Sequence, residues 1–308
     1  FYYQRSKTNE IAKMKKFRGT FTVMITPFSE DGLEINYKSL ERFVDWQIGE
    51  GIHGLIALGS TGEFLSLNEE ERYNISKIII ERTDRKVPVL IGTGAENTLD
   101  VIRYSRDAES LGADGVMIIP PFYSTPTENE IFNHYKRIAE SITIPIMIYN
   151  NPATANVDLT PNIVKNLSEI DNVSYIKEST MDVTRVRDII KLCGDKMTVF
   201  GGIMGYESFL NGAEGWVAVG SNIMPSEFAK LFKLAVVEKD IDKARNMYDH
   251  ILPIIELVGQ HRYTTATKAA LELMGLDVGP PRPPRLKSSG SELNWVKQVV
   301  ENNNLKIK

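Results

Sequence analysis

Cysteine is nearly absent from this 308-residue sequence, which contains only Cys193. A single cysteine cannot close an intrachain disulfide, so a disulfide-stapled fold is excluded and a reducing compartment, the cytoplasm, is the expected location. The surrounding sequence, Leu192-Cys193-Gly194, is typical of a helix end. We therefore expect Cys193 to fill space rather than to act as a nucleophile.

Long apolar runs are missing as well. No stretch approaches the roughly 18–20 apolar residues that span a bilayer, so no membrane segment is expected. Residues 1–8 lack the apolar core of a secretory signal. The 40 acidic and 36 basic residues give a formal net charge of −4, which argues against a nucleic-acid-binding surface.

Metal-ligand and nucleotide-binding patterns are also lacking. The four histidines are scattered, no Cys/His pair has ligand spacing, and no histidine follows a strand, so we expect no metal site. The Gly-Lys-Ser/Thr of a phosphate-binding P-loop does not occur. We also find no Ser-His-Asp set that could be placed on one face.

What the sequence does contain is a series of eight short apolar, β-rich runs separated by helix-like stretches. Their spacing predicts parallel strands joined by helices. Runs such as Gly54–Leu58 lack polar alternation, which is typical of strands covered on both faces. The runs end near Thr26, Leu58, Ile91, Ile119, Tyr149, Lys177, Gly201 and Ala218.

Eight such units predict a (β/α)₈ TIM barrel, and a doubly wound open sheet is the structural alternative. The alternative is weakened because no Gly-x-Gly-x-x-Gly follows the first strand. We expect an N-terminal extension over residues 1–17 that contributes little to the fold, the barrel over 18–235, and a C-terminal helical region over 236–308. Helices in that last region are predicted over 240–258, 264–274 and 291–301.

Several helix starts are recognisable from capping residues. Asn68 precedes three glutamates, which is the pattern of an N-cap followed by first-turn acids. Thr127 and Glu130 have the spacing of a capping box. Pro161 stands where a first helical residue is expected. These signals support helices between the predicted strands.

Lys177 and Tyr149 are the most informative residues. Each ends an apolar strand-like run, and one strand–helix–strand unit separates them. The reacting groups of such barrels lie at the C-terminal ends of the strands, so we expect the amine and the phenol to meet there. An amine beside a phenol suits imine chemistry on a carbonyl compound.

The chemistry requires a neutral amine, whereas an ordinary lysine is protonated at neutral pH. Apolar surroundings, such as Val173–Ile176 supply, favour the uncharged form and create a nucleophile. Tyr149 could move the protons that imine formation and carbon–carbon cleavage both need. The alternatives remain a lysine that extends into solvent and a tyrosine that packs in the core.

A third pattern, Gly59-Ser60-Thr61-Gly62, follows the second strand. Its two hydroxyls and exposed backbone N–H groups suit a carboxylate. Phosphate is a second possible ligand, and a tight turn without any ligand is a third interpretation.

Taken together, these segments resemble the dihydrodipicolinate synthase/N-acetylneuraminate lyase family. The resemblance covers roughly residues 18–300. It rests on Gly59-Ser-Thr-Gly-Glu63, Tyr149-Asn-x-Pro152, Ile176-Lys-Glu178, Thr265-Ala-Thr-Lys-Ala-Ala-Leu-Glu-Leu-Met-Gly275 and Gly279-Pro-Pro-Arg-Pro-Pro284.

The resemblance implies a class I aldolase-like barrel, usually a homotetramer, that needs no metal or organic cofactor. Lys177 would form a Schiff base with pyruvate or a longer 2-oxo acid, and Tyr149 would be the proton shuttle. Ser60 and Thr61 would hold the carboxylate of the substrate. The matching positions also include Tyr123, which would reach into a neighbouring subunit's site, and the pocket-lining residues Gly201 and Val217.

Two departures from the family pattern bear on the substrate. Synthases follow Tyr-Asn-x-Pro with a small residue and an arginine that grips the second substrate's carboxylate, whereas this chain has Ala153-Thr154. Sialic acid lyases match better at Pro152-Ala153 but carry an acidic pair after the seventh strand. This chain has Gly201-Gly-Ile-Met204 there.

We therefore predict a Schiff-base lyase that cleaves or forms a 2-keto-3-deoxy sugar acid or a similar 2-oxo acid, or that dehydrates one. The alternative is dihydrodipicolinate synthase, which condenses pyruvate with aspartate semialdehyde. Two readings of another kind remain: a barrel that binds a small molecule without catalysis, and a phosphate-binding barrel.

Overall fold

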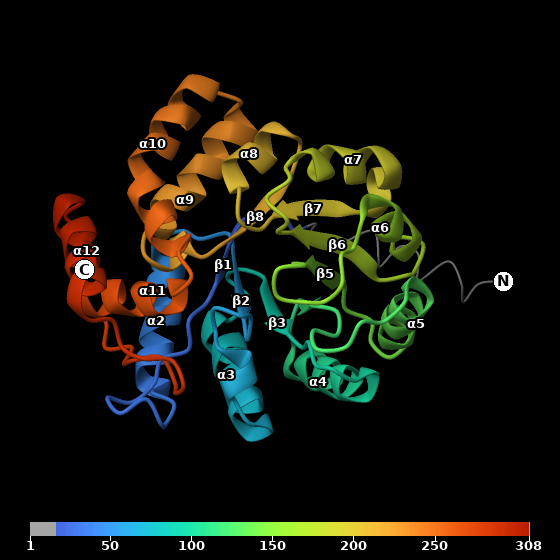
Figure 1. Cartoon of the computed structure of the whole chain (residues 1–308), viewed down its shortest axis with the longest axis horizontal. Coiled ribbons are helices and arrows are strands. Elements are labelled where there is room, and N and C mark those ends of the chain that lie inside the picture. Colours follow the sequence, from blue (N-terminus) through green and yellow to red (C-terminus); the bar gives the residue numbers. More distant parts are fainter. Residues whose placement is uncertain (1–16, 308) are drawn as a thin grey trace.

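The computed structural model describes residues 17–307 and shows a closed barrel of eight parallel strands surrounded by helices (Figure 1). The (β/α)₈ prediction is thus confirmed. Neighbouring strands pair in sequence order, and β8 closes on β1. The strands are β1 Gly19–Val23, β2 Gly54–Ala57, β3 Val89–Gly92, β4 Gly115–Ile118, β5 Ile146–Asn150, β6 Val173–Glu178, β7 Thr198–Gly201 and β8 Gly215–Ala218.

Helices follow the strands around the outside of the barrel. The helices between strands are α2 Tyr37–Gly49, α3 Glu69–Thr83, α4 Thr98–Leu111, α5 Glu128–Ala139, α6 Pro161–Leu167, α7 Thr184–Cys193 and α8 Gly205–Leu210. Short 3₁₀ turns add η1 Phe64–Ser66, η2 Gly194–Lys196 and η3 Gly220–Asn222. The predicted starts are confirmed: Asn68 and Thr127 each form a capping box, and Pro161 opens α6.

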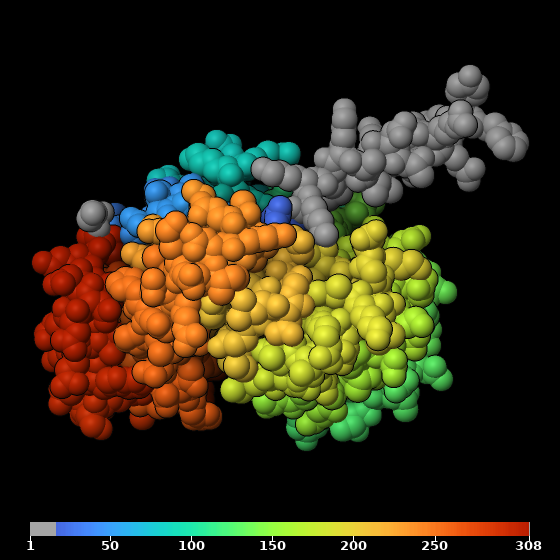
Figure 2. Space-filling view, turned by 90° about the horizontal axis from the view of Figure 1, so that it is seen from above, coloured from blue at the N-terminus to red at the C-terminus, as the bar shows by residue number. Residues whose placement is uncertain are grey.

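After β8 the chain is helical, as expected from the sequence. α9 Pro225–Phe232 continues into the π-helical turn η4 Lys233–Glu238, followed by α10 Ile241–Val258, α11 Tyr263–Leu273 and α12 Gly290–Asn302. The C-terminal helices form one continuous mass against the barrel (Figure 2). No helix in the described range 17–307 is long and apolar enough to cross a membrane.

Aromatic rings fill the barrel below the strand ends. Phe21 meets Phe200 edge-to-face with ring centroids 5.3 Å apart, and Phe17 stacks on Tyr175 at 4.8 Å. Gly215 leaves the space that the Phe200 ring occupies, since a Cβ there would lie 2.1 Å from the ring. Aromatic side chains therefore pack the interior of the barrel toward its N-terminal end.

Two sequence-based boundaries are changed by these observations. The first strand ends at Val23 rather than near Thr26, because Ile25 N–H donates to the Asn222 side chain instead of to a strand. Most of the predicted extension, residues 1–16, lies outside the described residues. Phe17, assigned to it, is buried in the barrel floor. The division at residue 235 stays a prediction.

The C-terminal region also reaches the rim of the barrel that carries the strand ends. Phe28, in the loop between β1 and α2, donates its N–H to the carbonyl of Val278 at 2.9 Å. Gly279 has φ +63° and lies so close that a Cβ would come within 2.3 Å of the Phe28 carbonyl oxygen. Residues far apart in the sequence thus meet beside the open end of the barrel.

Candidate active site

Lys177 and Tyr149 lie side by side at the C-terminal ends of β6 and β5. They are register partners in the parallel pair of strands. Their exposed fractions are 7% and 6%, and Lys177 Nζ lies 3.9 Å from the centroid of the Tyr149 ring. The structure therefore brings together the two groups that the strand-end argument paired, in surroundings shielded from water.

The phenol of Tyr149 is held in a polar setting. Asn151 Nδ2 donates a hydrogen bond of 2.9 Å to its hydroxyl oxygen. Burial raises the pKa of Tyr149, but the positive charge of protonated Lys177 and the hydrogen bonds that the phenol receives outweigh burial. The net pKa lies below the ordinary tyrosine value, which favours a phenol that can give up and regain its proton.

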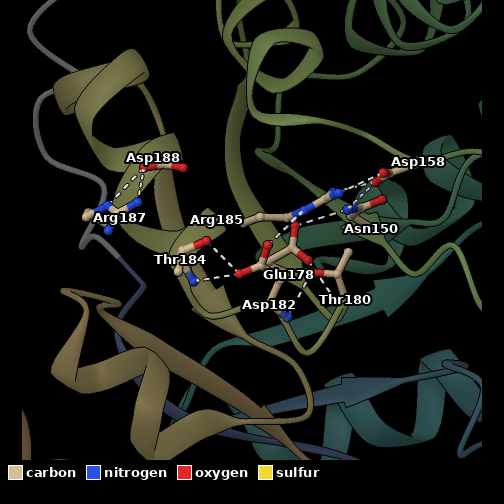
Figure 3. A network of polar contacts seen from close by, with 9 residues as sticks. All are labelled: Asn150, Asp158, Glu178, Thr180, Asp182, Thr184, Arg185, Arg187 and Asp188. Atoms are coloured by element: carbon tan, nitrogen blue, oxygen red, sulfur yellow. Dashed lines mark hydrogen bonds and ion pairs between the residues drawn. The ribbon is translucent and has the colours of Figure 1, made fainter.

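Polar contacts fix the ends of β5 and β6 behind these two residues (Figure 3). Asn150 Nδ2 donates to Glu178 Oε2 at 3.0 Å and to Asp158 Oδ1 at 3.3 Å. Arg185 grips Asp158 with two bonds of 2.5 and 2.8 Å. Burial raises the pKa of the Glu178 carboxyl, although its hydrogen bonds partly offset this effect. The neighbours of Tyr149 and Lys177 in sequence are thus locked to each other.

Ser60 and Thr61 occupy the turn after β2. Gly62 N–H donates to the Gly59 carbonyl at 3.0 Å, and the Thr26 hydroxyl donates to the Gly62 carbonyl at 2.7 Å. Thr61 is buried, and Ser60 is half-buried. A small cavity is lined by the loop after β2, by β3 and β4 with their following loops, and by β5: Leu58, Gly59, Ser60, Phe64, Gly92, Gly94, Met117, Ile119 and Tyr149.

The remaining predicted site residues have three different positions. Tyr123 is 86% exposed in the loop after β4, whereas Lys177 and Tyr149 are buried. Gly201 ends β7 opposite Glu178, and a Cβ added to it would meet Ser208 at 2.7 Å. Val217 is buried in β8. The roles suggested for these residues stay predictions.

Sequence reasoning missed several groups that reach the site. Asn151 lies inside a quoted motif but was given no role. Tyr263, the first residue of α11, is a second phenol near the site: burial and Tyr149 raise its pKa, while Thr264, Thr61 and Arg285 lower it in part. Tyr263 does not follow a predicted strand, so its position near the site could be found only from the fold.

Glu63 and Lys268 were also missed as a pair. Their charged groups lie 3.0 Å apart in the interior, immediately behind the Ser60–Thr61 turn. Both residues belong to quoted motifs of the family resemblance, so a search for charged residues inside those motifs could have found them. Their separation in the sequence gives no indication that they touch.

The fold and the site together define a TIM-barrel enzyme of the lysine-dependent aldolase class. The model of the dihydrodipicolinate synthetase family matches residues 16–303. The chain belongs to this family, and the resemblance stated from the sequence is confirmed. It is therefore a lyase of the class I aldolase type.

Individual relatives agree with this assignment. The 4-hydroxy-tetrahydrodipicolinate synthase of Thermodesulfovibrio yellowstonii is 35% identical over 265 residues, which cover 84% of this chain and 89% of the relative. That of Syntrophus aciditrophicus is 33% identical and covers 93% and 98% of the two chains. The chloride-inhibited dihydrodipicolinate synthase of Acinetobacter baumannii, solved with pyruvate, has a TM-score of 0.91 at 31% identity, covering 94% and 100%.

Proposed function

We propose that Lys177 forms a Schiff base with the keto carbon of pyruvate or a longer 2-oxo acid. Tyr149 transfers the protons, and Ser60 and Thr61 hold the carboxylate. The observation that carries the proposal is the buried Nζ of Lys177, 3.9 Å from the Tyr149 ring. An imine-forming enzyme needs an amine and a proton-transferring group side by side in a site shielded from water, and these two residues provide them.

The reaction follows from these positions. Nζ in its neutral form adds to the keto carbon, and the keto oxygen leaves as water after Tyr149 has supplied a proton. The resulting protonated imine accepts the electron pair that remains when the adjacent carbon loses a proton or a carbon–carbon bond breaks. In the synthetic direction the enamine carbon attacks an aldehyde, whose oxygen takes up a proton. Hydrolysis then releases the product and restores Lys177.

For the second substrate we place aspartate semialdehyde first. The relatives that cover most of this chain carry the name 4-hydroxy-tetrahydrodipicolinate synthase, which supports the alternative derived from the sequence over the sugar-acid reaction. No metal or organic cofactor is required, because the imine on Lys177 supplies the electron sink.

A 2-keto-3-deoxy sugar acid remains the second candidate because of Thr154. Thr154 occupies the position of the arginine that the synthases use, and both its N–H and its hydroxyl are directed to the Asn151 carbonyl, at 3.0 and 3.3 Å. A hydroxyl turned to its own backbone provides no bidentate grip on a second carboxylate. A polyol substrate would not need that grip.

The exposed position of Tyr123 supports an assembly in which this residue completes a neighbouring chain's site. We therefore propose a homotetramer. A reducing, cytoplasmic location stays an expectation from the single cysteine.

Reduction with borohydride in the presence of pyruvate tests the imine directly. We expect a stable mass increase on the peptide that contains Lys177 and none on the same peptide of Lys177→Met. An unmodified wild-type protein after full exposure would favour a barrel that binds small molecules without catalysis.

Two assays decide between the substrates. Purified protein is incubated with pyruvate and aspartate semialdehyde, and separately with a panel of 2-keto-3-deoxy sugar acids followed by pyruvate detection. Condensation at a higher kcat/KM than any cleavage supports the synthase. Pyruvate release from a sugar acid without condensation supports the second candidate.

A further inference from the structure

Glu63 is a buried carboxylate in an unusual backbone conformation, directly after the Ser60–Thr61 turn. Its side chain has no exposed area, and its φ of +58° lies in the left-handed region, which non-glycine residues rarely adopt. Surrounding structure must hold such a residue in place. The question is which contacts do so, and what they hold besides Glu63.

Lys268 of α11 is the charged partner of Glu63. Its Nζ lies 3.0 Å from Glu63 Oε1, and its side chain is 1% exposed. The same Nζ donates to the Pro280 carbonyl at 3.1 Å and lies 4.1 Å from the centroid of the Phe28 ring. Burial lowers the pKa of Lys268 to about 8, and Glu63 offsets part of that effect.

A second contact to Glu63 also comes from the end of the chain. Arg282 donates its backbone N–H to Glu63 Oε2 at 3.0 Å. Its guanidinium donates to the Ser66 carbonyl at 2.9 Å and pairs with Glu71 of α3 at 2.8 Å. Residues 279–285 and α11 thus enclose the segment that follows the turn.

The backbone joins these contacts to the turn itself. Glu63 N–H donates to the Ser60 carbonyl at 3.1 Å, and Ser66 N–H donates to the Glu63 carbonyl at 2.8 Å. A rotation of the Glu63 backbone out of its left-handed conformation would therefore disturb the peptide groups of Ser60–Gly62. The N–H groups of Ser60 and Thr61 and their two hydroxyls are the donors assigned to the substrate carboxylate.

Stability alone does not account for the pair. Replacing a buried ion pair with apolar residues of similar size is often neutral or stabilising, because removing two charges from water costs about as much as their attraction returns. A pair kept immediately behind a ligand-binding turn therefore calls for another explanation.

We propose that Glu63 and Lys268 are positioning residues, which hold the Ser60–Thr61 turn in the conformation that binds the substrate carboxylate. The C-terminal region thereby sets the affinity of the barrel for its 2-oxo acid. This inference rests on the proposed function, in which that turn binds the carboxylate.

Borohydride trapping measured against pyruvate concentration tests the inference. Lys268→Met removes the cation nearest to Glu63 and leaves the partly exposed Arg285, whose Nη1 lies 3.6 Å from Glu63 Oε2. We expect half-maximal trapping to need roughly tenfold more pyruvate, with an unchanged plateau because Lys177 is intact. Lys287→Met is the matched control. Lys287 also pairs with a glutamate, Glu272 of α11, at 3.3 Å, but this pair lies on the surface. Its half-saturation should stay within about twofold of wild type.

The double variant Glu63→Gln/Lys268→Met separates positioning from folding. With neither charge buried, the melting temperature should recover much of what Lys268→Met loses, whereas the raised half-saturation should persist. If half-saturation returns to wild type together with stability, the pair is structural and the inference is overturned. The same holds if Lys268→Met folds and traps pyruvate as wild type does. A wild type that traps no pyruvate at all would instead overturn the proposed function, and this inference with it.

Discussion

The open end of the barrel contains two regions that are held in different ways. Lys177 and Tyr149 are fixed by their own strands: they pair in register, and their sequence neighbours Glu178 and Asn150 bond to each other at 3.0 Å. The Ser60–Thr61 turn is instead followed by Glu63, whose carboxylate contacts Lys268 and Arg282 from the end of the chain.

If the proposed roles hold, this difference is expected to separate the reaction from substrate affinity. A group on a paired strand has little freedom to move, so the reacting atoms keep their places as long as the barrel is folded. A turn after a strand has more freedom and takes its shape from whatever packs against it. We therefore expect changes around β5 and β6 to alter kcat, and changes around Glu63 to alter the substrate concentration that is needed.

Removing the amine has the largest expected effect. Lys177→Ala should abolish imine trapping and lower turnover by about 10⁴-fold or more, because the proposed covalent intermediate forms on the Lys177 amine. Circular dichroism and the melting profile should show an intact fold. Trapping that persists in this variant would contradict the assignment.

Removing the phenol hydroxyl comes next. Tyr149→Phe should lower kcat by about 10²–10⁴-fold, the usual range for a positioned acid–base group, while pyruvate is still bound. Steady-state kinetics measures both parameters. A variant with the kcat of wild type would remove Tyr149 from the mechanism.

Restoring the missing cation sharpens the choice of second substrate. Thr154→Arg should raise kcat/KM for condensation with aspartate semialdehyde by about 10-fold or more, since a charge-assisted bidentate pair contributes roughly 1.5–3 kcal/mol. Thr154→Met provides similar length without charge and should give no gain. Equal rates for the two variants would show that position 154 does not contact this substrate.

Weakening the polar contacts at the end of β6 should have a smaller effect, which we expect on kcat. Glu178→Gln loses the charge-assisted bond from Asn150, so we expect kcat to fall by about 10-fold while half-saturation for pyruvate changes little. Asp188→Asn is the control, because Asp188 lies at the exposed edge of the network in Figure 3 and pairs with Arg187. A rise in half-saturation alone would break the separation between the two regions.

The titration of Tyr149 gives the smallest change. Lys177→Met removes the positive charge that favours the phenolate, leaves burial to dominate, and should move ionisation of Tyr149 to higher pH. The phenolate absorbance of Lys177→Met, minus that of Lys177→Met/Tyr149→Phe, gives the titration of Tyr149 without the lysine. Wild type minus Tyr149→Phe gives its titration with the lysine present. Equal midpoints for the two titrations would show that the charge of Lys177 does not lower the pKa of Tyr149.

The contrast between the regions also explains what the sequence could predict. The barrel, its helix caps and the pairing of Lys177 with Tyr149 follow from apolar spacing and strand ends, which are local patterns. Local patterns could not predict that Lys268 lies beside Glu63 or that Tyr263 lies near the site. Only tertiary packing brings α11 to the loop that follows the second strand. The early end of β1 was missed for a similar reason, since the side chain of Asn222, distant in sequence but in the turn after the neighbouring strand β8, replaces the strand partner.

One measurement tests both halves of the site at once: a crystal structure of the protein soaked with pyruvate. Continuous density should join Lys177 Nζ to the former keto carbon, with the carboxylate bound by Ser60 and Thr61 and the Tyr149 hydroxyl nearby. Pyruvate bound elsewhere, or held in the barrel without a bond to Lys177, would contradict the account.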